Sequence, residues 1–247
     1  MQTHKVRVEV SQKRVRVYLG GELVVDTIRP LLVWEGPYPT YYLPVADFRA
    51  ELVPTGVTDR SPSRGTADLL NVVTARATAA GAARRYADSP TEELRDTIRL
   101  DWAAMDEWLE EDEPVYTHAR DPYSRVDILA SSRHVRVELG GVIVAESRSP
   151  RLLFETGLPT RYYLPLADLR HDLLRPSDRR TSCPYKGTAE YWSVEVNGER
   201  HDNLVWIYRT PLPESQKIAG YACFYNERVD LYVDDVLQER PRSRFGG

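Results

Sequence analysis

A short polar loop in the second half of the chain carries the residue types best suited to chemistry. It reads Cys183-Pro-Tyr185-Lys186-Gly and is followed by Tyr191-Trp192, which places a thiol, a phenol, an amine and an indole within ten residues. A cation three residues from a thiol on a turn can favour the reactive thiolate. Cys183 and Lys186 are therefore the candidate catalytic residues of a cysteine-dependent enzyme that acts on a small metabolite.

The same residues also suit a binding module that catalyses nothing. Aromatic walls with a few polar groups are typical of small-molecule sites, and the lysine would anchor an anionic or amide group of the ligand. Whether the protein is an enzyme stays open, and a structural or protein-interaction module is a third hypothesis. Because aromatic residues also favour strands, we expect about half of them to lie in sheet cores. The expected ligand-binding residues are Tyr162, Tyr163, Cys183, Tyr185, Lys186, Tyr191, Trp192, Trp206 and Tyr208.

The loop belongs to the second of two copies of one sequence. At an offset of 120 residues Gly20-Gly21 falls on Gly140-Gly141, and one inserted residue then places Tyr41-Tyr42 on Tyr162-Tyr163. This repeat is far longer than a solenoid unit, so each copy should have its own core. We expect domains at residues 1–112 and 126–240, joined by a linker over residues 113–125. A chain that already contains such a pseudo-symmetric pair is expected to be a monomer.

The corresponding loop of the first copy has lost most of these side chains. It reads Ser61-Pro-Ser63-Arg64-Gly, and two leucines replace the Tyr-Trp pair. We therefore expect a degenerate site in the first copy and ligand binding by the second copy alone. Lys186→Ala should then lose most of the stabilisation that the ligand gives, while leaving the stability of the ligand-free protein nearly unchanged.

Alternating polar and apolar residues predict antiparallel strands in both copies. Residues 14–19 and 133–139 alternate and run into Gly-Gly, which is typical of a strand entering a tight hairpin. Pro44 and Pro165 favour short helices over residues 45–53 and 166–174. Residues 101–111 space Trp102, Met105 and Leu109 along one helical face, and the acidic run 110–113 is expected to face solvent. Each domain is predicted to be mainly β, with antiparallel sheets and a short helix.

Composition and charge exclude several classes of function. With 33 basic and 37 acidic residues the net charge is -4, which weighs against binding to nucleic acid. Apolar runs are too short to cross a membrane, and the first ten residues lack the apolar core of a signal peptide, so a cytoplasmic location is expected. Two cysteines and five scattered histidines do not form a tetrahedral metal site. We therefore expect neither a metal nor a cofactor, and a small molecule as the partner.

Two motifs of the second copy, CPYKGTAEYW and IAGYACFYNERVDLYVDD, and RPLLVWEGPYPTYYLP of the first resemble the family named domain of unknown function 427. The resemblance implies a β-tent fold, in which two antiparallel sheets meet over a pocket. Cereblon's ligand-binding domain and methionine sulfoxide reductase B have similar folds and usually hold zinc through two Cys-x-x-Cys pairs, which this sequence lacks. The family is also labelled nucleotidyltransferase-like. A phosphate-cradling Gly-rich loop with paired carboxylates, which that activity requires, is not evident here.

Overall fold

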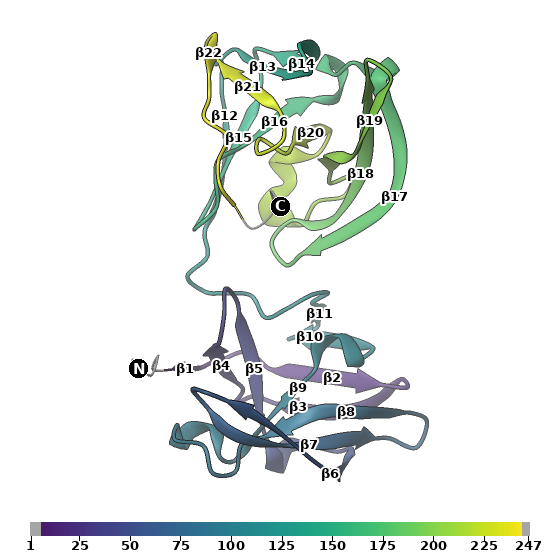
Figure 1. Ribbon diagram of the computed structural model, residues 1–247. Helices are drawn as coiled ribbons and strands as arrows, with labels where there is room; N and C mark the ends of the chain where they lie inside the picture. The colour runs from purple at the N-terminus through teal and green to yellow at the C-terminus, as the bar shows by residue number, and fades with distance from the viewer. Residues whose placement is uncertain (1–5, 244–247) are drawn as a thin grey trace. The chain divides into compact units, whose positions relative to one another are not determined.

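The computed structural model describes residues 6–243. The chain divides into two compact units, Met1–Asp121 and Pro122–Gly247 (Figure 1). Within the described residues each unit contains one antiparallel sheet of seven strands and one of four. The prediction of two mainly β domains in tandem is confirmed. Val115 and Ala119, from the segment expected to be a linker, are buried in the first unit. No helix among residues 6–243 has the length and apolar character needed to span a membrane.

The first unit is built from two sheets and three short 3₁₀ helices. Its large sheet has the order β1 (Arg7–Val10), β4 (Leu31–Trp34), β5 (Pro39–Pro44), β9 (Thr97–Leu100), β8 (Thr78–Arg85), β7 (Gly65–Val73) and β6 (Glu51–Ser61). Its small sheet has the order β11 (Glu113–Pro114), β10 (Glu107–Glu110), β2 (Val15–Leu19) and β3 (Glu22–Thr27). The 3₁₀ helices are η1 (Val45–Asp47), η2 (Glu92–Leu94) and η3 (Trp102–Ala104).

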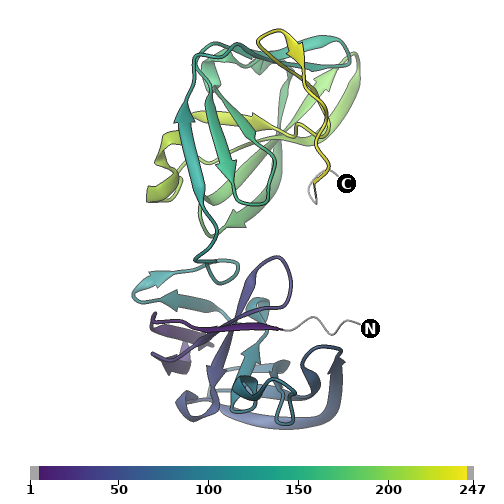
Figure 2. The same ribbon diagram turned by 90° about the vertical axis from the view of Figure 1, so that its left-hand side faces the viewer.

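The second unit repeats both strand orders of the first. Figure 2 shows the strands of both units from a second direction. Its large sheet has the order β12 (Val126–Ala130), β15 (Arg151–Glu155), β16 (Arg161–Pro165), β20 (Tyr221–Phe224), β19 (Glu199–Ile207), β18 (Gly187–Val196) and β17 (Leu174–Cys183). Its small sheet has the order β14 (Val142–Ser147), β13 (Val135–Leu139), β21 (Asp230–Val233) and β22 (Val236–Leu237). The 3₁₀ helices are η4 (Leu166–Asp168), η5 (His171–Leu173) and η6 (Pro213–Ile218).

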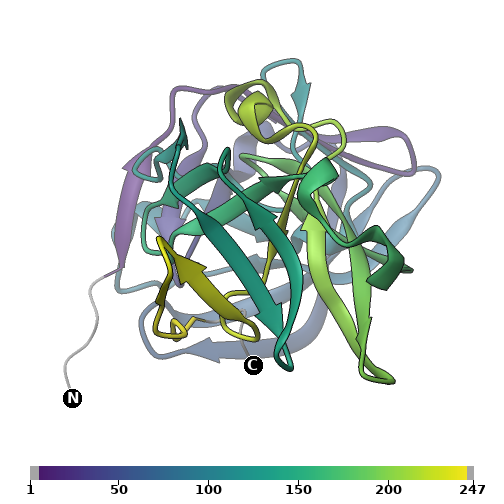
Figure 3. The same ribbon diagram turned by 90° about the horizontal axis from the view of Figure 1, so that it is seen from above.

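The predicted Gly-Gly hairpins join β2 to β3 and β13 to β14. All four glycines have positive φ, between 56° and 77°, which glycine adopts at little steric cost. In Figure 3 the hairpin β21–β22, in yellow, lies beside the hairpin β13–β14, and hydrogen bonds join β13 to β21. The sequence pattern is sufficient to predict these connections.

Each large sheet buries side chains on both of its faces. One face packs against the small sheet to form the inner core, which contains Val17 and Leu43 in the first unit. The opposite face carries a second buried group, here called the outer-face cluster. It contains Tyr42 in the first unit and Tyr163 in the second. Since neighbouring residues of a strand point to opposite faces, the two members of each tyrosine pair are separated by the sheet.

Three sequence-based helix predictions need correction. The helices expected over residues 45–53 and 166–174 shorten to η1 and to η4 with η5, because β6 begins at Glu51 and β17 at Leu174. The helical face expected over residues 101–111 is wrong. That segment forms η3 and then β10, whose alternation buries Trp108 and Glu110 while Glu107 faces solvent. Trp102 stacks on Trp108 with ring centroids 4.1 Å apart, so the aromatic spacing reflects packing between the two elements.

Candidate functional site

The polar loop of the second unit is the turn between β17 and β18. Gly187 has φ +94°, a conformation that L residues with a side chain rarely adopt. The Ser215 hydroxyl donates a hydrogen bond to the carbonyl of Tyr185 at 2.9 Å. The backbone N–H of Leu212 donates to the carbonyl of Lys186 at 3.2 Å. These bonds hold the loop against η6 and the segment before it, and Lys186 is buried.

Lys186 forms an ion pair with Glu155, the last residue of β15. The distance from Lys186 Nζ to Glu155 Oε2 is 2.5 Å, and the two side chains are 10% and 11% exposed. Removing one member of a buried ion pair leaves a charge without compensation, at a cost of about 3–5 kcal/mol. The structure therefore gives no support to the expectation that Lys186→Ala leaves the stability nearly unchanged.

A row of side chains crosses the outer face beside this ion pair. Tyr191 lies opposite Trp206, Trp206 opposite Cys223, and Cys223 opposite Tyr163. Trp206 Nε1 donates a hydrogen bond to the Tyr163 hydroxyl at 3.0 Å, and the two rings meet at 90°. Burial raises the pKa of Tyr163 and of Tyr208, so both phenols are protonated at neutral pH and can donate hydrogen bonds.

The structure therefore brings part of the expected ligand-binding set together. Tyr163, Tyr191, Trp206 and Tyr208 belong to one buried cluster. Tyr162 and Trp192 pack against the inner core on the opposite face of the sheet. Half-buried Tyr185 and Cys183 lie in the turn and at the end of β17. Burial is the main cause of the raised pKa values of Tyr163 and Tyr208, and Cys183 is among the smaller electrostatic causes.

The expected ligand-binding set did not include Cys223, which belongs to this cluster, or Arg161, which lies beside it. Cys223 is fully buried, and burial raises the pKa of its thiol to about 12. The Arg161 guanidinium lies 5.5 Å from the centre of the Trp206 ring and pairs with Glu227. Arg161 lies opposite Leu153 in the sheet, as Thr40 lies opposite Val33 in the first unit, so Arg161 occupies the position of Thr40. The sequence match pairs Thr40 with Thr160 instead and gives no signal for this buried charge.

The first unit keeps three of these groups at equivalent positions. Arg64 Nη1 lies 2.6 Å from Glu35 Oε1 and donates to the Tyr42 hydroxyl at 2.9 Å. The Tyr42 hydroxyl donates to Glu35. A carboxylate, a cation and a phenol are thus shared by both units, as Glu35, Arg64 and Tyr42 and as Glu155, Lys186 and Tyr163. The first copy retains more of the site than its loop sequence indicates.

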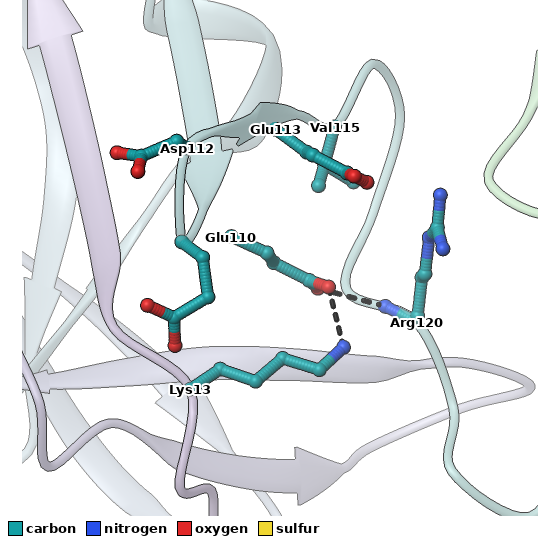
Figure 4. Close-up of a pocket in the computed structure, with 7 residues that line it drawn as sticks. Lys13, Glu110, Asp112, Glu113, Val115 and Arg120 are labelled. Carbon is teal, nitrogen blue, oxygen red and sulfur yellow. Dashed lines mark hydrogen bonds and ion pairs between the residues drawn. The ribbon is translucent and has the colours of Figure 1, made fainter.

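A separate cavity of about 390 Å³ lies in the first unit (Figure 4). Glu110 is buried there and accepts hydrogen bonds from the Tyr41 hydroxyl at 2.9 Å and from Lys13 Nζ at 2.5 Å. The backbone N–H of Arg120 also donates to Glu110, at 3.3 Å. Glu110 therefore departs from the predicted solvent-facing acidic run, whereas residues 111–113 are exposed as expected. In the second unit Val233 stands at the strand position equivalent to that of Glu110. The buried carboxylate and its hydrogen bonds therefore have no counterpart there.

None of these groups forms a metal centre. Among residues 6–243, no group of three or more His, Cys, Asp and Glu side chains is placed to hold a metal ion.

A family model described as Domain of unknown function (DUF427) matches residues 7–111 and again residues 127–235. One match lies in each structural unit, and together they cover most of the chain. No curated protein sequence matches the chain.

Proposed function

The chain belongs to the DUF427 family and carries its domain twice, and we propose that the second unit binds a small neutral molecule that contains an amide. The observation that carries the proposal is the buried ion pair between Lys186 and Glu155 beside the aromatic cluster. Its net charge is zero, so an anionic ligand would have to compete with Glu155 for the lysine. An amide instead offers its carbonyl oxygen to Lys186 and its N–H to Glu155, and displaces neither.

The surroundings of the ion pair favour a flat, partly apolar ligand. The buried rings of Tyr163 and Tyr208 lie in the aromatic cluster beside the ion pair, and burial raises the pKa of both hydroxyls. Half-exposed Cys183 lies at the start of the same turn and can contact a ligand without reacting with it. Sites with aromatic walls and a few oriented polar groups are typical of small-molecule binding.

The cysteine-dependent enzyme remains the second candidate. Cys183 is the more accessible of the two free thiols, which favours it over Cys223 as a nucleophile. The amine of Lys186, however, pairs with Glu155 at 2.5 Å. The carboxylate offsets the positive charge that would promote thiolate formation, so the binding module has the stronger support.

A thermal-shift comparison of matched ligands tests the proposal. The probes are the neutral amides nicotinamide and benzamide, beside the carboxylates nicotinate and benzoate. We expect one or more amides to stabilise the full chain, by about 2.7 kcal/mol at about 100 times the dissociation constant. The double variant Lys186→Met/Glu155→Gln removes both charges together and should lose this stabilisation.

The matched control is Arg64→Met/Glu35→Gln, which makes the same change in the first unit and should retain the amide shift. If a carboxylate gives a larger shift than its amide, and only the Lys186 double variant loses it, the ligand is an anion and the proposal is wrong. If no shift depends on the Lys186 and Glu155 pair, this unit does not bind these ligands at the loop.

A further inference from the structure

The outer face of the first unit has a row of arginines where the second unit has an indole and a thiol. In the first unit Leu69 lies opposite Arg84, Arg84 opposite Arg99, and Arg99 opposite Tyr42. The equivalent row of the second unit is Tyr191, Trp206, Cys223 and Tyr163. The tyrosine at the end of the row is shared, and the two central residues are cationic in the first unit and uncharged in the second.

The charges on this face do not balance. Arg64 and Arg99 both pair with Glu35, at 2.6 and 3.5 Å, and Arg84 pairs with exposed Asp59 at 3.4 Å. Among the described residues, these pairs set three guanidinium groups against two carboxylates. The three arginine side chains are only 16%, 23% and 29% exposed, so water screens the excess charge incompletely.

The pairing of the strands makes this excess positive charge destabilising when no ligand is bound. Like charges directly opposite each other on neighbouring strands destabilise a sheet, and Arg84 and Arg99 occupy such a pair of positions. Arg99 Nε is buried, and its contact with Glu35 Oε2 at 3.5 Å is an ion pair without hydrogen-bond geometry. An anion placed between the two guanidinium groups would remove the repulsion and supply acceptors for their N–H groups.

The neighbouring side chains complete a set of donors. The guanidinium carbon of Arg64 lies over the ring of Tyr86, 5.1 Å from its centre, in a cation–π contact. Burial raises the pKa of Tyr42 and of Tyr86, so both hydroxyls keep their protons at neutral pH. Planar guanidinium groups bind carboxylate and phosphate oxygens in pairs of parallel hydrogen bonds.

We propose that the first unit has a ligand site of its own, in which Arg84, Arg99 and Arg64 bind the oxyanion group of a small molecule. The single excess positive charge matches a monoanion, so a carboxylate fits better than a doubly charged phosphate ester. The first unit is then a site with a changed charge preference rather than a degenerate copy. This inference does not depend on ligand binding by the second unit.

Isothermal titration of the full chain with benzoate and with phenyl phosphate tests this site. We expect benzoate to bind, with an affinity that falls as salt is added, and to bind more tightly than phenyl phosphate. Arg99→Gln should weaken benzoate binding at least about tenfold, since a hydrogen bond to a charged group contributes about 1.5–3 kcal/mol. Phenyl phosphate binding more tightly, with the same dependence on Arg99, would assign the site to phosphate esters.

The control variant is Arg85→Gln, which removes an exposed arginine from the opposite face of the same strand. It should leave benzoate binding unchanged. Arg99→Cys, which introduces the residue of the equivalent position in the second unit, provides a second variant compatible with the fold. Equal benzoate affinity in wild type, Arg99→Gln and Arg99→Cys would overturn the proposal, as would the absence of binding by both probes.

The Lys186→Met/Glu155→Gln variant separates this inference from the proposed function of the second unit. Benzoate binding should persist in that variant. Loss of benzoate binding there, with retention in Arg99→Gln, would place the anion in the second unit and refute the inference.

Discussion

Arg161 shows how this fold accommodates a buried charge. Its guanidinium forms two hydrogen bonds of 2.7 Å to Glu227 and one of 2.8 Å to the side-chain oxygen of Asn226. Burial alone would raise the pKa of Glu227, but hydrogen bonds from Arg161 and Ser243 outweigh burial and hold this pKa below its usual value. The carboxylate is therefore more stable in the folded protein than in the unfolded chain.

Glu227→Gln should destabilise the protein by about 3 kcal/mol at pH 7, because it leaves the buried Arg161 charge without its carboxylate. A carboxylate with a lowered folded pKa contributes stability above its unfolded pKa of about 4.3, and this contribution is lost as the pH falls through the folded value. Wild type should therefore lose more stability than Glu227→Gln between pH 5 and about pH 3. Urea unfolding across this range measures the difference.

The control for this pH dependence is Glu239→Gln, which changes an exposed carboxylate of the same unit. Its stability should follow that of wild type. Parallel pH profiles for wild type and Glu227→Gln would contradict the role assigned to this carboxylate.

At the scale of elements, the sequence predicts the strands and hairpins better than the segments between them. Alternation over five or more residues identifies β2 and β13, whereas Trp102, Met105 and Leu109 fit a helical period by coincidence in a short segment. Tertiary packing decided that case, because Trp108 and Glu110 both point inward from β10.

The candidate site was predictable only in part, because packing and strand pairing decide which residues meet there. The motif Cys183-Pro-Tyr-Lys186-Gly marks the turn, but composition does not say which member of a tyrosine pair faces it. The partner of Lys186 lies 31 residues away at the end of another strand, so only the sheet register brings Glu155 to it. The first unit's arginine row is equally invisible along the chain, because Arg84 and Arg99 become neighbours only through strand pairing.

The turn glycines that open β7 and β18 make a testable pair. Gly65 and Gly187 have φ of +91° and +94°, so alanine at either position should cost about 1–3 kcal/mol in backbone strain. A Cβ at Gly65 would lie 3.2 Å from Pro90, closer than ordinary contact, whereas one at Gly187 would lie 3.5 Å from the nearest atom. Gly65→Ala should therefore destabilise its unit more than Gly187→Ala does.

Equilibrium urea unfolding of Gly65→Ala and Gly187→Ala measures which variant loses more stability. Gly21→Ala is a useful comparison, since its φ is also positive but its Cβ would meet no atom within 4 Å. A larger loss of stability in Gly187→Ala than in Gly65→Ala would show that strain in the second turn, and not contact with Pro90, dominates.

For the whole molecule, each unit has an inner core and an outer-face cluster drawn from its own residues. The strand orders of the two units are the same. A domain with a complete core can in principle fold alone. Because each unit forms its core from its own residues, each unit is expected to be stable without the other.

Fragments 1–121 and 122–247 should each fold when expressed separately and unfold cooperatively. We expect the second fragment to retain any amide binding of the full chain, and the first to retain any benzoate binding. Circular dichroism and titration of both fragments check these outcomes. A fragment that stays unfolded by itself would show that its unit requires the other for stability.

The glutamate, the tyrosine and the cation that both units share also indicate the sequence of changes in the history of the chain. Two copies of one family domain descend from a single ancestral gene, and both have a glutamate, a tyrosine and a cation at equivalent positions. These three groups therefore predate the duplication. Arg99 and Cys223 occupy equivalent positions and differ, so at least one of them was substituted after the copies separated. Selection on one copy could change its charge while the other preserved the ancestral role.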